Sequence, residues 1–98
     1  MPQPKLSEAD IYEHLTHLPG WSLIDNSVTK LFKFGTFIAS IQFVNQVAQA
    51  AEAVNHHPDI YIRYDKVTLT LSTHDSGGIT LYDMQLAAAC DDLADQIS

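Results

Sequence analysis

The sequence is poor in positive charge and in cysteine, and it has no long apolar run. Its five lysines and arginines stand against twelve acidic residues, for a net charge of −7. This argues against direct nucleic-acid binding, which needs cations that face the phosphates. Cys90 is the single cysteine, so no internal disulfide can form, as is usual in a reducing compartment. No stretch approaches the ~20 apolar residues that span a bilayer, and residues 1–5 lack the apolar run of a secretory signal. A cytoplasmic protein without membrane or nucleic-acid partners is expected.

What is present is the composition of an ordinary small globular protein. The chain has 98 residues, of which 46% are apolar and 17% charged. It is expected to form one domain over residues 1–98, with residues 1–6 flexible. A domain of this size without disulfides is marginally stable by itself. Because association buries more apolar surface and unpaired sheet edges invite pairing, a homodimer or homotetramer is expected.

Three helices are predicted from capping residues and from apolar residues at helical spacing, over residues 7 to about 18, 37 to about 54 and 80 to about 97. The expected N-caps are Ser7, Thr36 and Thr80, with Asp83 at the third position of the last helix. Asn55 is expected in the left-handed conformation that often ends a helix. The predicted buried stripe of the first helix is Ile11, Leu15 and Leu18. That of the second is Phe37, Ile41, Val44, Val47, Ala48, Ala51 and Val54.

Four strands are predicted as two hairpins, residues 21–24 with 28–34 and residues 60–64 with 67–72. The turns are expected at 25–27 and near Asp65 and Lys66. The order is therefore helix, strand, strand, helix, strand, strand, helix. Since each strand pair has one apolar face, the helices should cover a single side. The predicted fold is α+β, a four-stranded antiparallel sheet with three helices packed on one face.

Three histidines fall at the ends of the second strand pair. His56 and His57 precede the third strand, and His74 follows the fourth. The open end of an antiparallel hairpin would bring them together, and histidine is the side chain best suited to proton exchange near neutral pH. Glu52, one helical turn before His56, could reach the same place.

The acids Asp75 and Asp83 are also nearby in sequence, although Asp83 is more typical of a helix cap than of a catalyst. Three histidines and a carboxylate could instead bind zinc. Adjacent residues on an extended backbone point to opposite faces, which makes His56 and His57 awkward joint ligands. No metal is therefore expected, and the zinc site is kept as an alternative.

Several of these residues together resemble the signature of the pterin-4a-carbinolamine dehydratases. The resemblance rests on the run from Glu52 to Pro58, Glu-Ala-Val-Asn-His-His-Pro, followed by Tyr64, Val67, Ser72-Thr73-His74-Asp75, Gly77-Gly78 and Asp83. Leu18-Pro19-Gly20-Trp21 and Phe32-Lys33-Phe34 are similar to the family's first hairpin. The resemblance extends from about Leu15 to the C-terminus and implies the fold predicted above.

The resemblance also implies a function, the removal of water from 4a-hydroxytetrahydropterin to give quinonoid dihydropterin, in recycling of the tetrahydropterin cofactor. It makes His56, His57 and His74 the catalytic histidines, with Glu52 and Asp83 as supporting acids. Asn55 stands where many members have Asp. The site is further expected to include Asp75 and Trp21, although a cluster of Trp21 with Phe32 and Phe34 is more typical of a core.

The expected chemistry needs one acid and one base, because the hydroxyl must be protonated to leave and a ring nitrogen must lose a proton. His56 and His74 are expected to form this pair without metal or cofactor. His57 is expected to orient the pterin and Glu52 to bias the charge of a neighbouring imidazole. The main alternative is a non-catalytic interaction protein of the same fold, such as a dimerisation cofactor of a transcription factor or a Rubisco assembly factor.

Overall fold

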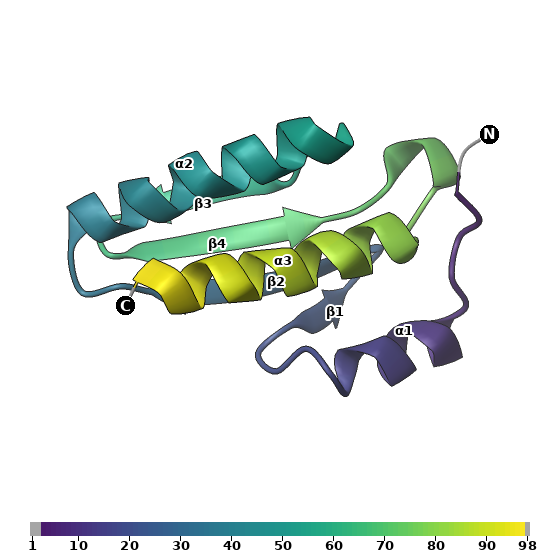
Figure 1. The fold of residues 1–98 in the computed structure, drawn as a ribbon. Coiled ribbons are helices and arrows are strands. Elements are labelled where there is room, and N and C mark those ends of the chain that lie inside the picture. The colour runs from purple at the N-terminus through teal and green to yellow at the C-terminus, as the bar shows by residue number, and fades with distance from the viewer. Residues whose placement is uncertain (1–2, 98) are drawn as a thin grey trace.

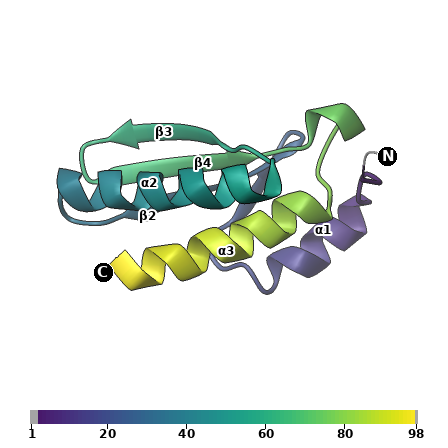
Figure 2. The same ribbon diagram turned by 45° about the horizontal axis from the view of Figure 1, so that its top comes forward.

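A computed structural model describes residues 3–97 and has the predicted order of elements (Figure 1). The elements are α1 (Glu8–Leu15), β1 (Ser22–Ile24), β2 (Ser27–Lys33), α2 (Phe37–Val54), β3 (Asp59–Arg63), β4 (Lys66–Leu71), the short 3-10 helix η1 (His74–Ser76) and α3 (Leu81–Ile97). The sheet is antiparallel throughout, in the order β1-β2-β4-β3. Figures 1 and 2 show the helices on one face of it, which confirms the predicted α+β fold. Within residues 3–97, no helix combines the length and apolarity that crossing a membrane requires.

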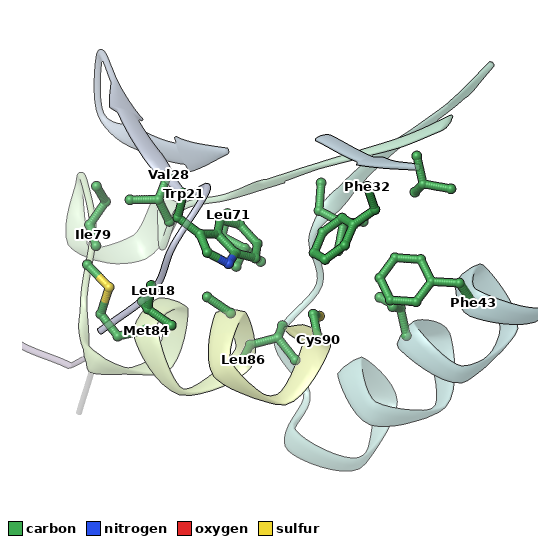
Figure 3. Packing of buried hydrophobic residues seen from close by; sticks show 14 of the residues in the cluster. Leu18, Trp21, Val28, Phe32, Phe43, Leu71, Ile79, Met84, Leu86 and Cys90 are labelled. Carbon is green, nitrogen blue, oxygen red and sulfur yellow. The ribbon is translucent and has the colours of Figure 1, made fainter. Parts of the chain in front are cut away.

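The core lies between the sheet and the helices (Figure 3). Every second residue of β4 is fully buried, namely Val67, Leu69 and Leu71, because successive side chains of a strand point to opposite faces. The ring of Phe32 on β2 packs against Phe43 of α2, with the ring centroids 4.8 Å apart. Helix α3 completes the core with Met84, Leu86, Ala87 and Cys90.

Helix α2 buries only part of the predicted stripe, namely Val47 and Ala51. Its buried residues are Ser40, Phe43, Val47 and Ala51, whereas Phe37 and Val54 are 48% and 62% exposed. The helix carries apolar residues around much of its circumference, so spacing alone did not determine which of them meet the sheet. Ser40 is accommodated in the core because its hydroxyl donates to the carbonyl of Thr36, 3.1 Å away.

Two element boundaries were also predicted wrongly. Helix α1 ends at Leu15 rather than near Leu18, since the amides of residues 16–18 bond to carbonyls three positions back, a tightening that often ends a helix. Leu18 is nevertheless buried, as predicted.

The turn of the second hairpin lies one residue earlier than expected. Tyr64 is not in the strand but in the turn, with φ of 53°, because Arg63 pairs with Lys66 and leaves Tyr64 and Asp65 as the loop.

The N-terminal segment was expected to be flexible over residues 1–6. Residues 1 and 2 lie outside the described part of the chain, but the following residues contact the fold. Ser76 donates its hydroxyl to the carbonyl of Gln3, and the amide of Leu6 donates to the carbonyl of Ile79, 2.8 Å away. A Cβ atom on Gly78 would lie 2.8 Å from the Lys5 side chain, so this segment runs closely over the loop that follows His74.

Candidate active site

The three candidate histidines line one depression at one end of the sheet. There the C-terminal end of α2, the loop with η1 and the start of α3 lie near one another (Figures 1 and 2). The depression has a volume of about 240 Å³ and is lined by Asn55, His56, His57, Thr73, His74 and Asp75. As predicted from antiparallel pairing, the start of β3 and the end of β4 lie at the same end of the hairpin. Residues 56–57, before β3, and residue 74, after β4, therefore line the same depression.

The end of α2 fixes the backbone of His56. Asn55 is left-handed, with φ of 51° and ψ of 45°, as predicted. The amide of Asn55 bonds to the carbonyl of Glu52 and the amide of His56 to that of Ala51, which together form a Schellman motif. This motif turns the chain sharply at the helix end, so His56 and His57 leave α2 in directions set by helix termination.

His56 contacts a fully buried carboxylate at the start of α3. Its Nε2 atom lies 2.5 Å from Oδ1 of Asp83, and the two side chains are 13% and 0% exposed. The other oxygen, Oδ2, accepts from the amide of Thr80 at 2.9 Å and from the hydroxyl of Thr73 at 2.8 Å. The hydroxyl of Thr80 accepts in turn from the amide of Tyr82. The predicted capping pair of Thr80 and Asp83 is therefore confirmed, and the same acid also holds an imidazole.

His57 forms a second histidine–carboxylate pair at the surface. Its Nε2 atom hydrogen-bonds to Oε2 of Glu52, and these side chains are 54% and 76% exposed. Exposed pairs of this kind contribute little to stability. Glu52 thus approaches His57, and it is Asp83 that contacts His56.

His74 and Asp75 lie in η1 and are exposed. The loop that carries them is closed by Thr73, whose amide donates to the carbonyl of Gly78 at 2.9 Å. Gly77 ends η1 with φ of 74°, a conformation that favours glycine. Both side chains therefore face the depression from a short, backbone-closed loop.

Two residues near His56 were not predicted. Thr73 bonds to Asp83, and the Tyr82 ring lies 5.8 Å from the His56 ring, centroid to centroid. The sequence neighbours of Thr73 and Tyr82, which are His74 and Asp83, are predicted site residues. Nothing in the residue types themselves indicated that the two side chains would contact the site.

Trp21 does not line the depression, in contrast to its expected place in the site. It is buried in the core (Figure 3), and its ring meets that of Phe32 edge-on with centroids 6.0 Å apart. Its indole Nε1 donates to Oδ1 of Asp91, 3.0 Å away. The apolar neighbours and the satisfied N–H group make Trp21 a core residue, as its cluster with Phe32 suggested.

Metal ligation was the alternative use of the histidines. Among residues 3–97, no three His, Cys, Asp or Glu side chains gather closely enough to hold a metal ion. Nε2 of His56 and Nε2 of His57 face different carboxylates, Asp83 and Glu52. The arrangement consists of two histidine–carboxylate pairs and a third histidine across the depression.

Comparison with known proteins gives one consistent family. The sequence profile of pterin 4 alpha carbinolamine dehydratase matches residues 4–93. A protein of Chloroflexus aurantiacus, provisionally named a pterin-4-alpha-carbinolamine dehydratase, is 52% identical over 92% of this chain and 97% of its own. One of Picosynechococcus with the same provisional name is 47% identical over 91% of this chain and 97% of its own.

Solved structures agree with these sequence relatives. The crystal structure of a transcriptional coactivator/pterin dehydratase from Brucella melitensis superposes with a TM-score of 0.89 at 35% identity, covering 92% of this chain and 98% of that one. A pterin dehydratase-like RuBisCO assembly factor of the alpha-carboxysome superposes with a TM-score of 0.63 at 25% identity, over 76% and 86%. With the profile match, the sequence identities and the shared fold, the chain belongs to the pterin-4-alpha-carbinolamine dehydratase family.

Proposed function

We propose that this chain removes water from 4a-hydroxytetrahydropterin, giving quinonoid dihydropterin, and so serves tetrahydropterin recycling. The observation that carries the proposal is the depression lined by His56, His57 and His74, in which His56 is bonded to a fully buried carboxylate. Histidines placed in this way can exchange protons with a ligand on either side of it. The provisional names of the sequence relatives support the same reaction.

The reaction balances with one acid and one base. The C4a–O bond breaks as the hydroxyl takes up a proton and leaves as water, and a ring nitrogen releases a proton as its double bond forms. We assign these two transfers to His56 and His74, which line the same depression. Nε2 of His56 is bonded to Asp83, which makes Nδ1 the nitrogen for proton exchange. The Asp83 contact also holds the ring in one orientation, as a carboxylate does for a catalytic imidazole.

His57 is assigned to substrate binding, and Glu52 holds its ring. Since both are exposed, a bound pterin could contact the His57 ring while Glu52 holds it. Such a contact binds the ground state and the transition state alike, so its loss should raise KM more than it lowers kcat.

The deciding experiment is a dehydratase assay with freshly generated carbinolamine, corrected for spontaneous dehydration. His56→Ala and His74→Ala should each lower kcat about 10²-fold or more, the usual contribution of a placed acid or base. His57→Ala should act mainly on KM. The control is His17→Ala, which removes an exposed histidine in the turn between α1 and β1 and should leave the kinetics unchanged. A wild type no faster than the spontaneous reaction would instead indicate a non-catalytic interaction protein.

The zinc alternative is tested in the same assay. Chelator treatment should leave turnover unchanged, since the two proton transfers need no Lewis acid. Loss of turnover that added zinc restores would favour the metal site and contradict the histidine mechanism.

We also propose that the chain works as a homodimer or homotetramer. Large apolar side chains are exposed on α2 and on the edge strand β3, where Ile38 is 66% and Tyr61 63% exposed. Strand β3 pairs with β4 on one side, and its other edge is unpaired among the described residues. An unpaired strand edge beside apolar side chains favours pairing with another chain. Light scattering at micromolar concentration should show a dimer or tetramer, and a monomer alone would contradict the proposal.

A further inference from the structure

Thr73, the residue before His74, bonds both to the loop that carries His74 and to the carboxylate that contacts His56. Thr73 is nearly buried, and its backbone exchanges two hydrogen bonds with Gly78, its amide donating at 2.9 Å and its carbonyl accepting at 3.3 Å. The same carbonyl accepts from the amide of Ser76 at 3.0 Å. These bonds close the loop that carries His74. The side chain of Thr73 points the other way, toward the carboxylate that contacts His56.

The hydrogen bonds around Thr73 run in one direction, toward Asp83. An ionised carboxylate only accepts, so the Thr73 hydroxyl donates its single proton to Oδ2 of Asp83. The Thr73 oxygen lies 2.8 Å from the Thr80 hydroxyl oxygen, and in that contact Thr80 must be the donor. The chain of donors therefore runs from Thr80 through Thr73 to Asp83. Each hydroxyl in it both donates and accepts.

This chain determines how Asp83 meets His56. Oδ2 receives two bonds, from the Thr73 hydroxyl and the Thr80 amide, which leaves Oδ1 facing Nε2 of His56. The carboxylate of Asp83 is fully buried, and it cannot rotate without breaking both of these bonds. Because Oδ1 of a carboxylate can only accept, Nε2 of His56 donates to it, and in a neutral ring this is the tautomer with Nδ1 unprotonated.

We propose that Thr73 is a positioning residue that sets the tautomer and orientation of His56 through Asp83 and holds the loop of His74 through its backbone. This rests on the function proposed above, in which both histidines transfer protons. Thr73 itself transfers no proton. It holds both His56 and His74 in place, so the relative position of the acid and the base depends on this one residue.

The test replaces Thr73 by valine, which has nearly the same shape but lacks the hydroxyl group. Thr73→Val should lower kcat by about 10- to 100-fold, the cost of a displacement of about 1 Å in a placed catalytic group, with KM changed much less. Thr73→Ser keeps the hydroxyl and should restore most of the turnover. The matched control is Thr70→Val on β4, whose hydroxyl bonds to that of Thr29 at 3.2 Å and does not line the depression. It should leave kcat unchanged.

A second readout does not depend on activity. Nitrogen-15 NMR of the histidine rings distinguishes the two neutral tautomers, and the wild type and Thr73→Ser should show His56 protonated at Nε2. In Thr73→Val the carboxylate of Asp83 keeps only the Thr80 amide on Oδ2, so it can turn away from His56, and a ring released from this contact should show a mixture of tautomers. If the wild type fails to dehydrate the carbinolamine, the proposed function is wrong. The His56 tautomers in wild type and Thr73→Val would still show whether Thr73 positions His56.

Equal kcat and the same His56 tautomer in wild type and Thr73→Val would overturn the proposal. Should Thr73→Val fail to fold, Thr73→Ser and Thr73→Ala form a second pair, since both lose the methyl group and only Ala loses the hydroxyl. Equal kcat and equal tautomers in these two variants would overturn it as well.

Discussion

The His56 imidazole and the Asp83 carboxylate are 27 positions apart in the chain and 2.5 Å apart in the fold, from Nε2 to Oδ1. His56 follows the left-handed end of α2, and Asp83 lies in the first turn of α3. The contact thus ties the end of one helix to the start of the next. Asp83 also accepts from the amide of Thr80 as a helix cap. One buried side chain therefore both caps a helix and contacts a histidine, and substitutions can separate these two interactions.

Asp83→Asn should impair turnover far more than folding. The amide oxygen can still accept from Thr80 and Thr73, but the NH₂ group would face Nε2 of His56 and donate to it. His56 would then switch to the tautomer protonated at Nδ1, and kcat should fall about 10²-fold. Urea denaturation should show a loss of only about 1 kcal/mol in the free energy of unfolding.

Asp83→Ala is the comparison for the structural role. It leaves the Thr80 amide and the Thr73 hydroxyl without their acceptor, so it should cost about 1–3 kcal/mol more than Asp83→Asn. Wild-type turnover in Asp83→Asn would show that the carboxylate serves only the helix cap.

Glu52→Gln is expected to change substrate binding and leave stability alone. Glu52 is 76% exposed and its hydrogen bond to His57 lies at the surface, where such pairs contribute little. The denaturation midpoint should therefore stay unchanged, while KM rises several-fold because the His57 ring is less well oriented. A fall in kcat at constant KM would instead give Glu52 a part in proton transfer.

The N-terminal segment should support the loop of His74. Ser76 donates to the carbonyl of Gln3, and the Leu6 amide donates to Ile79. The Leu6 amide should therefore be protected in hydrogen exchange, and Ser76→Ala should lower its protection by about tenfold, as expected for a lost hydrogen bond. Ser72→Ala, which removes a hydroxyl bonded to the Asn26 carbonyl instead, is the control. Rapid exchange of the Leu6 amide in the wild type would contradict this role.

The parts of the fold that follow local rules could be predicted from the sequence. Thr36 caps α2 with its hydroxyl accepting from the amide of Ala39, and Asn55 ends it in the left-handed conformation. Both depend on residues at most a few positions away. The gathering of His56 and His74 at one depression was predictable for a similar reason, because antiparallel pairing fixes which strand ends meet.

The features that depend on tertiary packing could not be predicted. Phe43 rather than Phe37 faces the sheet, because a helix that is apolar on several sides is oriented by what it packs against. The indole of Trp21 donates to Asp91, 70 positions away, a partner that no local pattern indicates. Thr73 is linked to Asp83 only once β4 and α3 have come together. In each case the deciding partner is distant in sequence.

The single thiol should be unreactive while the protein is folded. Burial raises the pKa of Cys90 to about 12, and the charge of Asp91 adds to this. The thiolate is the nucleophile in alkylation, so iodoacetamide at pH 8 should leave native Cys90 unmodified, as measured by mass spectrometry. The same reagent in urea should modify it fully. Rapid labelling under native conditions would show that this part of α3 opens readily.

The raised pKa of Cys90 also predicts how stability depends on pH. The pKa of the thiol is 9.0 in the unfolded chain and about 12 in the folded one, so between these values the unfolded chain releases a proton that the folded chain retains. The free energy of unfolding should therefore fall as pH rises above about 9, by up to ~1.4 kcal/mol per pH unit from this group, and this fall should level off near 12. Cys90→Ala lacks the group, so wild type should lose stability relative to it between pH 8.5 and about 10.5 in urea titrations. Parallel pH profiles for the two proteins would contradict a buried thiol that stays protonated.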